Sequence, residues 1–264
     1  MSRLRRLAHR AARGAARSLS PELRELALAL GARAVAGPAL LPGPPPGPVL
    51  VLAPHPDDET IGCGGALARH AARGDRVTVV VATSGEATGG GQGDVAAARE
   101  AECRAACAEL GIGEPVFLRL PDGRLGQRVD ALAAVLRTQG VDAAVLYLPT
   151  LLDPHPDHRA ANAAAAAAGL DAATFGYEVW AAAPVDVLLD VTDVWPRKEA
   201  ALARYATALE TVDYARVCAG LAAYRSACGG MGGRGMAEGF LRLDAAQHRA
   251  LTASLHAGGP GAAR

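Results

Sequence analysis

The sequence contains very little lysine and few aromatic residues. Lys198 is the only lysine among 27 basic residues, and Phe, Trp and Tyr make up 4% of the 264 residues. This excess of arginine, together with abundant alanine, is typical of GC-rich coding DNA, so we expect a bacterial source. Acidic residues also number 27 and the formal net charge is zero. We therefore expect no general attraction to nucleic acid.

Paired cysteines and long hydrophobic runs are also missing. The five cysteines are an odd number, with no Cys-x-x-Cys spacing. This argues against a disulfide framework and a thiolate zinc site, and it fits a reducing cytoplasm. No run of 18 apolar residues occurs, so we expect no transmembrane helix.

The first 36 residues form a basic arm. Eight arginines lie between residues 3 and 33, against Glu22 and Glu25. These arginines interrupt the windows where the apolar core of a signal peptide would lie, so we expect no signal peptide. A solvated, partly helical arm is the expectation, and a segment that contacts a membrane surface or a partner protein is the alternative.

The segment "GPALLPGPPPGP" (37–48) separates the arm from the rest of the chain. Proline has no amide donor and disfavours a helix before it, so an extended linker is expected. The main domain is then expected at 49–257, followed by a flexible tail at 258–264.

After the linker, valine-rich runs alternate with amphipathic segments. We expect strands at 49–53, 76–83, 115–120 and 142–149, and helices at 61–74, 94–112 and 128–140. This alternation predicts an α/β fold with a mostly parallel sheet covered on both faces. The later part is harder to interpret: strands are expected at 178–180, 186–191 and 235–243, and helices at 196–209 and 212–227.

Two polar clusters follow predicted strands. "HPDDE" (His55–Glu59) comes after the first strand, and "HPDH" (His155–His158) comes after the fourth and before another helix. Ligands of such sheets bind at the carboxyl ends of the strands. If the two strands are neighbours, both clusters converge on one cleft. "GCGG" (Gly62–Gly65) lacks the spacing of a dinucleotide-binding loop.

Histidine and carboxylate side chains together suit a divalent metal. Two histidines and one carboxylate with an open position are typical of catalytic zinc, and iron(II) or another divalent ion is an alternative. A further carboxylate could accept a proton from water. A further histidine could stabilise an oxyanion or protonate a leaving amine. The clusters contain enough groups for all of these roles.

At these residues the chain resembles the LmbE-like, or PIG-L, family of metal-dependent de-N-acetylases. The resemblance rests on "PHPDDE" (54–59) and "HPDH" (155–158) and extends through "LPDGRL", "GYEVW" and "ALARYATALETVDY", roughly from Val49 to Leu243. It implies a Rossmann-like three-layer fold without a dinucleotide, and zinc-dependent hydrolysis of an N-acetyl group on an amino sugar.

The resemblance also implies roles for individual residues. The metal ligands would be His55, Asp58 and His158, and Asp57 would be the general base. His155 would be the acid or the oxyanion stabiliser, with Asp157 orienting it. Substrate contacts are implied for two further residues, Arg99 and Asp122.

The chain departs from the family pattern at Asp153, where members of the mycothiol pathway place a tyrosine that assists catalysis. The expected function is removal of an N-acetyl or other small N-acyl group from a small amino-sugar substrate. Alternatives are an amidase acting on a thiol-sugar conjugate or a lipid-linked sugar, and a non-catalytic sugar-binding or interaction protein. A homo-oligomer is compatible with the sequence. "TSGEATGGGQGD" (83–94), which is rich in glycine, is expected to be a loop on the substrate side of the site.

Overall fold

The structure is a computed structural model that describes residues 31–32, 36–88 and 95–257. The chain divides into two units, residues 1–37 and 38–264, and the second unit contains all the elements discussed below. Most of the predicted arm, the tail at 258–264 and residues 89–94 of the glycine-rich loop lie outside the described residues. The boundaries of the arm and the tail therefore stay predictions.

One sheet organises the described part of the second unit. Its eight strands lie in the order β1-β7-β8-β6-β5-β2-β3-β4. Only β8 runs antiparallel to its neighbours, β6 and β7, and the other pairs are parallel. The predicted α/β fold with a mostly parallel sheet is confirmed. The strands are β1 (Ala39–Leu41), β2 (Val49–Ala53), β3 (Val77–Thr83), β4 (Val116–Leu120), β5 (Val145–Pro149), β6 (Ala173–Tyr177), β7 (Val187–Asp190) and β8 (Ala237–Leu243).

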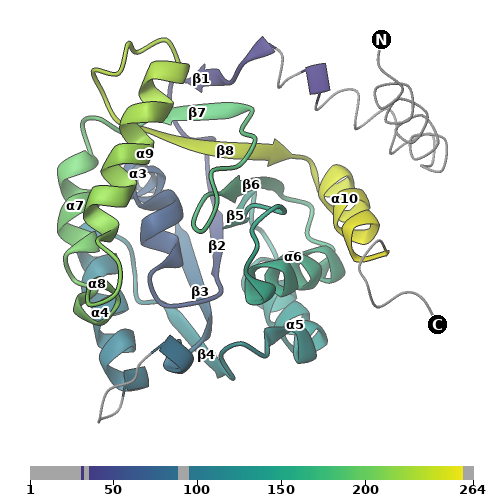
Figure 1. Ribbon diagram of the computed structural model, residues 1–264. Helices are drawn as coiled ribbons and strands as arrows, with labels where there is room; N and C mark the ends of the chain where they lie inside the picture. The colour runs from purple at the N-terminus through teal and green to yellow at the C-terminus, as the bar shows by residue number, and fades with distance from the viewer. Residues whose placement is uncertain (1–30, 33–35, 89–94, 258–264) are drawn as a thin grey trace, which may run out of the picture. The chain divides into compact units, whose positions relative to one another are not determined.

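Helices cover both faces of the sheet, which gives three layers (Figure 1). One face carries α3 (Asp58–Arg73), α4 (Val95–Leu110), α7 (Trp195–Leu202), α8 (Ala206–Leu209) and α9 (Tyr214–Cys228). The other carries α5 (Val129–Gln139), α6 (Pro156–Ala168) and α10 (Ala245–Ala257). Two short 3-10 helices, η1 (Glu86–Thr88) and η2 (Leu125–Gln127), lie in the connections.

The alternating side chains of β2 show why this strand is central. Val49 and Val51 pack into the core beneath α3 and α4, whereas Leu50 and Leu52 pack into the core beneath α5 and α6. All five residues of β2 are buried, as expected for a parallel strand covered on both faces. The strand is therefore fixed on both sides, and so is the polar turn that follows it.

Neighbouring strands make the expected topological switch point. β2 pairs with β3 on one side and with β5 on the other, both in parallel. β3 and β4 follow on one side of β2, and the next strand in the sequence, β5, lies on the other side of β2. The crevice outside the carboxyl ends of β2 and β5 is where this fold binds ligands, and both His-Pro-Asp clusters follow those two strands.

Several expected boundaries are wrong. The strand expected at 178–180 lies instead at Ala173–Tyr177 as β6. The helix expected at 196–209 is divided into α7 and α8. Within the expected linker, Ala39–Leu41 forms β1 and pairs with β7, so this segment adds an edge strand to the sheet. Helix α10 was not expected at all.

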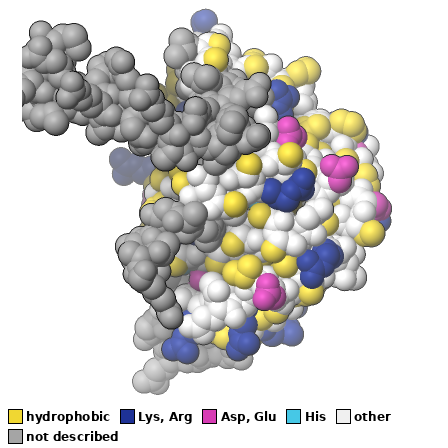
Figure 2. All heavy atoms as spheres, turned by 90° about the vertical axis from the view of Figure 1, so that its right-hand side faces the viewer, with side chains coloured by type: hydrophobic (Ala, Val, Ile, Leu, Met, Phe, Trp, Pro, Cys, Tyr) yellow, Lys and Arg dark blue, Asp and Glu magenta, His cyan; other side chains and the backbone are white. Residues whose placement is uncertain are grey.

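The face of the molecule that Figure 2 shows carries side chains of both charges. On the side that carries α5, α6 and α10, basic and acidic side chains are interspersed with hydrophobic ones. Among the described residues, no helix combines the length and the apolar character that crossing a bilayer requires.

Candidate metal centre

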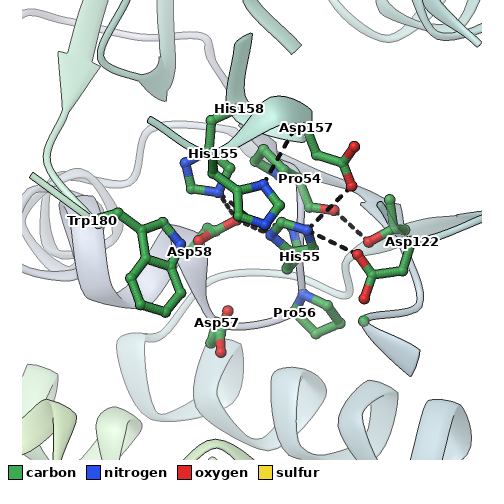
Figure 3. A network of polar contacts seen from close by, with 12 residues as sticks. Pro54, His55, Pro56, Asp57, Asp58, Asp122, His155, Asp157, His158 and Trp180 are labelled. Carbon is green, nitrogen blue, oxygen red and sulfur yellow. Dashed lines mark hydrogen bonds and ion pairs between the residues drawn. The ribbon is translucent and has the colours of Figure 1, made fainter. Parts of the chain in front are cut away.

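The two polar clusters meet at the carboxyl edge of the sheet. Thr150 donates its backbone amide to Tyr177, and the loop after β5 then turns back beside the end of β2. Helix α6 starts with His155 as its N-cap and Pro156 in its first turn. In Figure 3 the side chains of His55, Asp58, His155 and His158 point toward one another. The predicted convergence of the clusters is therefore observed.

Three donor atoms form a compact triangle in this group. The Oδ2 atom of Asp58 lies 3.1 Å from Nδ1 of His55 and 3.2 Å from Nε2 of His158. The two nitrogens are 3.4 Å apart. Ligands at about 2.0–2.1 Å from a tetrahedral zinc ion would be about 3.3–3.4 Å from one another. The triangle therefore has the dimensions of one face of such a site.

The charges of these side chains also suit a cation. Burial lowers the pKa of His158, but the charge of Asp58 and the contacts of the ring nitrogens with the carboxylates of Asp153 and Asp58 raise it to about 9. Burial raises the pKa of Asp58, yet His158 and His55 hold it well below its usual range. The buried carboxylates thus favour positive charge here, which either protons or a divalent cation can supply. The donor set fits a metal.

Further carboxylates hold the outer nitrogens of the two histidines. Nε2 of His55 lies 3.1 Å from Oδ1 of Asp122 and 3.4 Å from Oδ2 of Asp157. Nδ1 of His158 lies 3.1 Å from Oδ2 of Asp153. Such contacts orient metal-binding imidazoles and increase their basicity. His55 and His158 thus each turn one nitrogen to the triangle and the other to a carboxylate. Figure 3 shows this arrangement for His55.

Two residues with implied roles lie against His55. Asp157 was expected to orient His155; its backbone amide donates to Nδ1 of His155 at 3.2 Å, while its carboxylate faces His55 and accepts the backbone amides of Gly123 and Leu125 at 2.7 and 3.0 Å. Asp122 was expected to contact the substrate. Its side chain is 6% exposed, and its oxygens contact His55 and the backbone amide of Ala87. In this structure both carboxylates hold a candidate metal ligand.

Asp57 is set apart from the triangle (Figure 3). Its backbone has φ = 140°, which lies in a region that L-residues other than glycine rarely adopt. Its neighbour Asp58 starts α3, so the two adjacent carboxylates point in different directions. Burial raises the pKa of Asp57 to about 7, although the positive charge of Arg99 opposes the shift. A carboxylate with this pKa is suited to accept a proton near neutral pH.

Arg99 holds Asp57 from helix α4. Its Nη2 donates to Oδ2 of Asp57 at 2.9 Å and to the carbonyl of Pro56 at 3.0 Å. Nη1 donates to the carbonyl of Gly85 at 2.8 Å. Gly85 has φ = +66°, and a Cβ there would lie 2.4 Å from Nη1. Arg99 was expected to contact the substrate, but here its guanidinium is buried against Asp57.

His155 differs from the other two histidines. Its Nδ1 accepts the backbone amide of Asp157 at 3.2 Å, so a neutral ring carries its proton on Nε2. Burial lowers the pKa of His155, and nearby His55 and His158 lower it further. Its ring centroid is 4.8 Å from that of His55. The neutral ring can therefore donate one hydrogen bond beside the triangle.

Glu59 completes the first cluster but points into the core. Its carboxyl group is fully buried, accepts the hydroxyl of Thr60 at 2.8 Å and is hydrogen-bonded to Tyr205. Burial raises its pKa. The four polar residues after β2 therefore have different surroundings. His55 and Asp58 belong to the triangle, Asp57 contacts Arg99, and Glu59 holds the turn through hydrogen bonds in the core.

Sequence reasoning missed two residues of the site. Asp153 was noted only as a departure from the family pattern, although it contacts His158 directly. Trp180 was not singled out, yet it is 49% exposed and stacks on His155. A signal for Asp153 was its position in "LDPHPDH", where an acidic residue precedes two histidines. The scarcity of aromatic residues was the signal for Trp180.

The chain is similar to a known family and to several solved structures. Residues 50–169 match the family model described as PIG-L: GlcNAc-PI de-N-acetylase. The "conserved protein TT1542" of Thermus thermophilus is 30% identical, with 73% of this chain and 93% of that chain covered and a TM-score of 0.63. The N,N'-diacetylchitobiose deacetylase of Pyrococcus horikoshii, at 22% identity, shares the fold over 75% of this chain and 84% of its own, with a TM-score of 0.62.

A curated relative covers a smaller part of the chain. The 1D-myo-inositol 2-acetamido-2-deoxy-alpha-D-glucopyranoside deacetylase of Rhodococcus erythropolis is 34% identical over 161 residues. The match covers 49% of this chain and 55% of that protein. The chain thus spans about half the length of the curated relatives it matches.

Proposed function

The chain belongs to the PIG-L family of de-N-acetylases, and from this premise we propose that it is a metal-dependent hydrolase that removes an N-acetyl, or other small N-acyl, group from an amino sugar. The observation that carries the proposal is the triangle of His55, Asp58 and His158 with Asp57 beside it. The family is metal-dependent, and the bond broken would be a linear C–N amide bond.

His55, Asp58 and His158 would hold the metal, and we propose zinc. The support is the pair of imidazole nitrogens with one carboxylate oxygen at 3.1–3.4 Å spacing, a donor set typical of zinc hydrolases. A zinc ion held there would act as a Lewis acid on the amide carbonyl and lower the pKa of water.

Asp57 would be the general base. It would take a proton from the attacking water, and its pKa of about 7 suits that task near neutral pH. Arg99, at 2.9 Å, would keep the carboxylate oriented and oppose its protonation. Arg99 is thus proposed as a positioning residue for the base.

His155 would stabilise the negative charge that develops on the carbonyl oxygen. Its Nδ1 is occupied by the Asp157 amide, so the Nε2 proton is the one available for donation. As the amide bond breaks, a proton must reach the leaving amine. Asp57, protonated in the first step, is the group beside the triangle that can return it, whereas a neutral His155 donates a hydrogen bond and keeps its proton.

Acetate release tests the proposal. The purified protein is loaded with zinc and incubated with a panel of N-acetyl amino sugars, including inositol-linked and lipid-linked glucosamine and a thiol-sugar conjugate. Mass spectrometry should detect the free amine of at least one member together with acetate. The control is the double variant His55→Ala, His158→Ala, which should bind no stoichiometric zinc and release no acetate. Sugar binding without release from any member would favour a non-catalytic binding protein.

We also propose a cytoplasmic location. Support comes from the free thiols of the described chain, four of which are buried: Cys63, Cys103, Cys107 and Cys218. Free thiols are the usual state of cysteine in a reducing compartment. Fractionation of cells that express the tagged chain would test this location.

A further inference from the structure

Trp180 lies at the edge of the metal centre. It follows β6, whose carboxyl end adjoins that of β5. Its side chain is 49% exposed, whereas the other tryptophan, Trp195, is 5% exposed. In Figure 3 its indole lies beside His155. A half-exposed indole next to a candidate catalytic histidine is a surface that a bound substrate would meet.

One hydrogen bond holds the backbone at Trp180, and one ring contact orients its indole. The backbone amide of Trp180 donates to Oδ2 of Asp153 at 3.2 Å. The indole ring lies nearly parallel to the His155 ring, with an interplanar angle of 18° and a centroid distance of 6.5 Å. Asp153 also accepts the backbone amide of His155 at 2.9 Å. The same carboxylate therefore fixes both Trp180 and the loop that carries the histidines, so the aromatic surface is preorganised.

We propose that Trp180 is an aromatic subsite on which a sugar ring of the substrate stacks while its amide lies at the triangle. This inference rests on the proposed function and specifies how the site recognises a sugar. A pyranose has an apolar C–H face and hydroxyl groups at its edge. A fixed indole binds the apolar face.

In the described loops that follow β5 and β6, the exposed apolar surface is too small for a long acyl chain. Of the large exposed hydrophobic side chains in the described residues, only Leu152 and Trp180 lie in the loops that follow β5 and β6. An acyl chain of a lipid would need an apolar groove many methylenes long. The exposed indole of Trp180 has the size of a single sugar ring.

The protein supplies its own reporter because it contains only two tryptophans. In Trp195→Phe the remaining fluorophore is Trp180. The Nε1 atom of Trp195 has no hydrogen-bond partner among the described residues, so phenylalanine costs no hydrogen bond. In the matched variant Trp180→Phe the remaining fluorophore is the buried Trp195. The first probe is the methyl glycoside of N-acetylglucosamine, followed by the same N-acetyl sugar panel.

With the metal-loaded proteins, a bound sugar should shift the emission of Trp195→Phe to shorter wavelength and protect it from acrylamide quenching. Trp180→Phe should show neither effect. N-Methylacetamide, which carries the amide without the ring, should leave both spectra unchanged. Failure of every sugar in the panel to change the emission of Trp195→Phe would overturn the inference.

A second measurement separates stacking from a structural role. Trp180→Ala should weaken sugar binding about tenfold, as a dissociation constant or as KM, and Trp180→Tyr should restore most of it. Metal content and kcat should stay near those of the parent. Acetate release with an unchanged KM in Trp180→Ala would refute the subsite but not the hydrolase. Sugar-dependent fluorescence without acetate release would refute the hydrolase and support the subsite.

Discussion

The Nδ1 atom of His158 lies 3.1 Å from the Oδ2 atom of Asp153. Asp153 is 1% exposed, and it also accepts the backbone amides of His155 and Trp180. One buried carboxylate thus orients a candidate metal ligand and fixes the loops on either side of it. Asp153 lies two residues before His155, directly beside the second cluster, and it supports that cluster without being a proposed metal ligand.

Asp153→Asn should therefore weaken metal binding without unfolding the protein. Asparagine keeps the size of the side chain but loses the charge that makes His158 more basic, and loss of such an outer contact costs about 10–100-fold in metal affinity. Competition with a chelator of known affinity would measure this change. The control is Asp142→Asn at an exposed aspartate that pairs with Arg76. Equal zinc affinity in the two variants would contradict the role of Asp153.

The glycines of "GCGG" are explained by packing and not by phosphate binding. A Cβ on Gly62 would lie 2.1 Å from the ring of Tyr177, whereas a Cβ on Gly64 would be no nearer than 3.4 Å to any neighbour. Tyr177 is fully buried and donates its hydroxyl to the carbonyl of Leu52 at 2.8 Å. The ring therefore has little freedom to move aside.

Gly62→Ala should destabilise the protein by about 1–3 kcal/mol, the usual cost of overpacking a core. Gly64→Ala in the same helix, where the added Cβ meets its neighbours at ordinary contact distance, should be neutral or stabilise the protein by up to about 1 kcal/mol. Urea unfolding of both variants and the parent would measure the difference. Similar midpoints for the two variants would show that the ring of Tyr177 leaves room for a Cβ at Gly62.

The stability should also depend on pH through His248. This histidine is 3% exposed, and its Nε2 lies 3.0 Å from Oδ1 of Asn162. Burial lowers its pKa from 6.5 to about 4, with a further contribution from Arg249. Below pH 6.5 the unfolded chain takes up a proton at this position and the folded protein does not. The contribution to stability is therefore complete above pH 6.5 and is lost as the pH falls toward 4.

His248→Gln can keep the hydrogen bond to Asn162 but does not titrate. Between pH 6.5 and 4 the parent should lose up to roughly 3 kcal/mol more stability than the variant. Urea unfolding at several pH values would give the two slopes. If both proteins lost stability in parallel over this range, His248 would not be buried in its neutral form.

The sequence predicted the sheet well because its central strands are buried on both faces. β2, β3 and β5 are largely apolar runs, and their position before helical patterns indicates the parallel order. β6 was misplaced because "ATFGY" contains few β-branched residues and the more polar "EVW" beside it resembled a strand. Helix α10 was missed because its Ala-rich sequence has little periodic contrast.

The site was predictable only where the ligands lie close together in the sequence. The two clusters identify His55, Asp58 and His158 as candidates, and their convergence follows from the pairing of β2 with β5. The roles of Asp122 and Arg99 depend on contacts across 67 and 42 positions, from the loop after β4 and from α4. Local pattern carries no information about such contacts. The resemblance supplied the substrate roles of these two residues, and the structure adds their contacts with His55 and Asp57.

The division of labour between the adjacent residues Asp57 and Asp58 is the central claim. One experiment tests it directly: metal content and kcat measured on the same preparations of Asp57→Asn and Asp58→Asn. Asp57→Asn should retain stoichiometric metal while kcat falls by about 10²–10⁴, the usual contribution of a general base. Asp58→Asn should lose the metal. Loss of metal from Asp57→Asn, or full activity with the metal retained, would contradict the account.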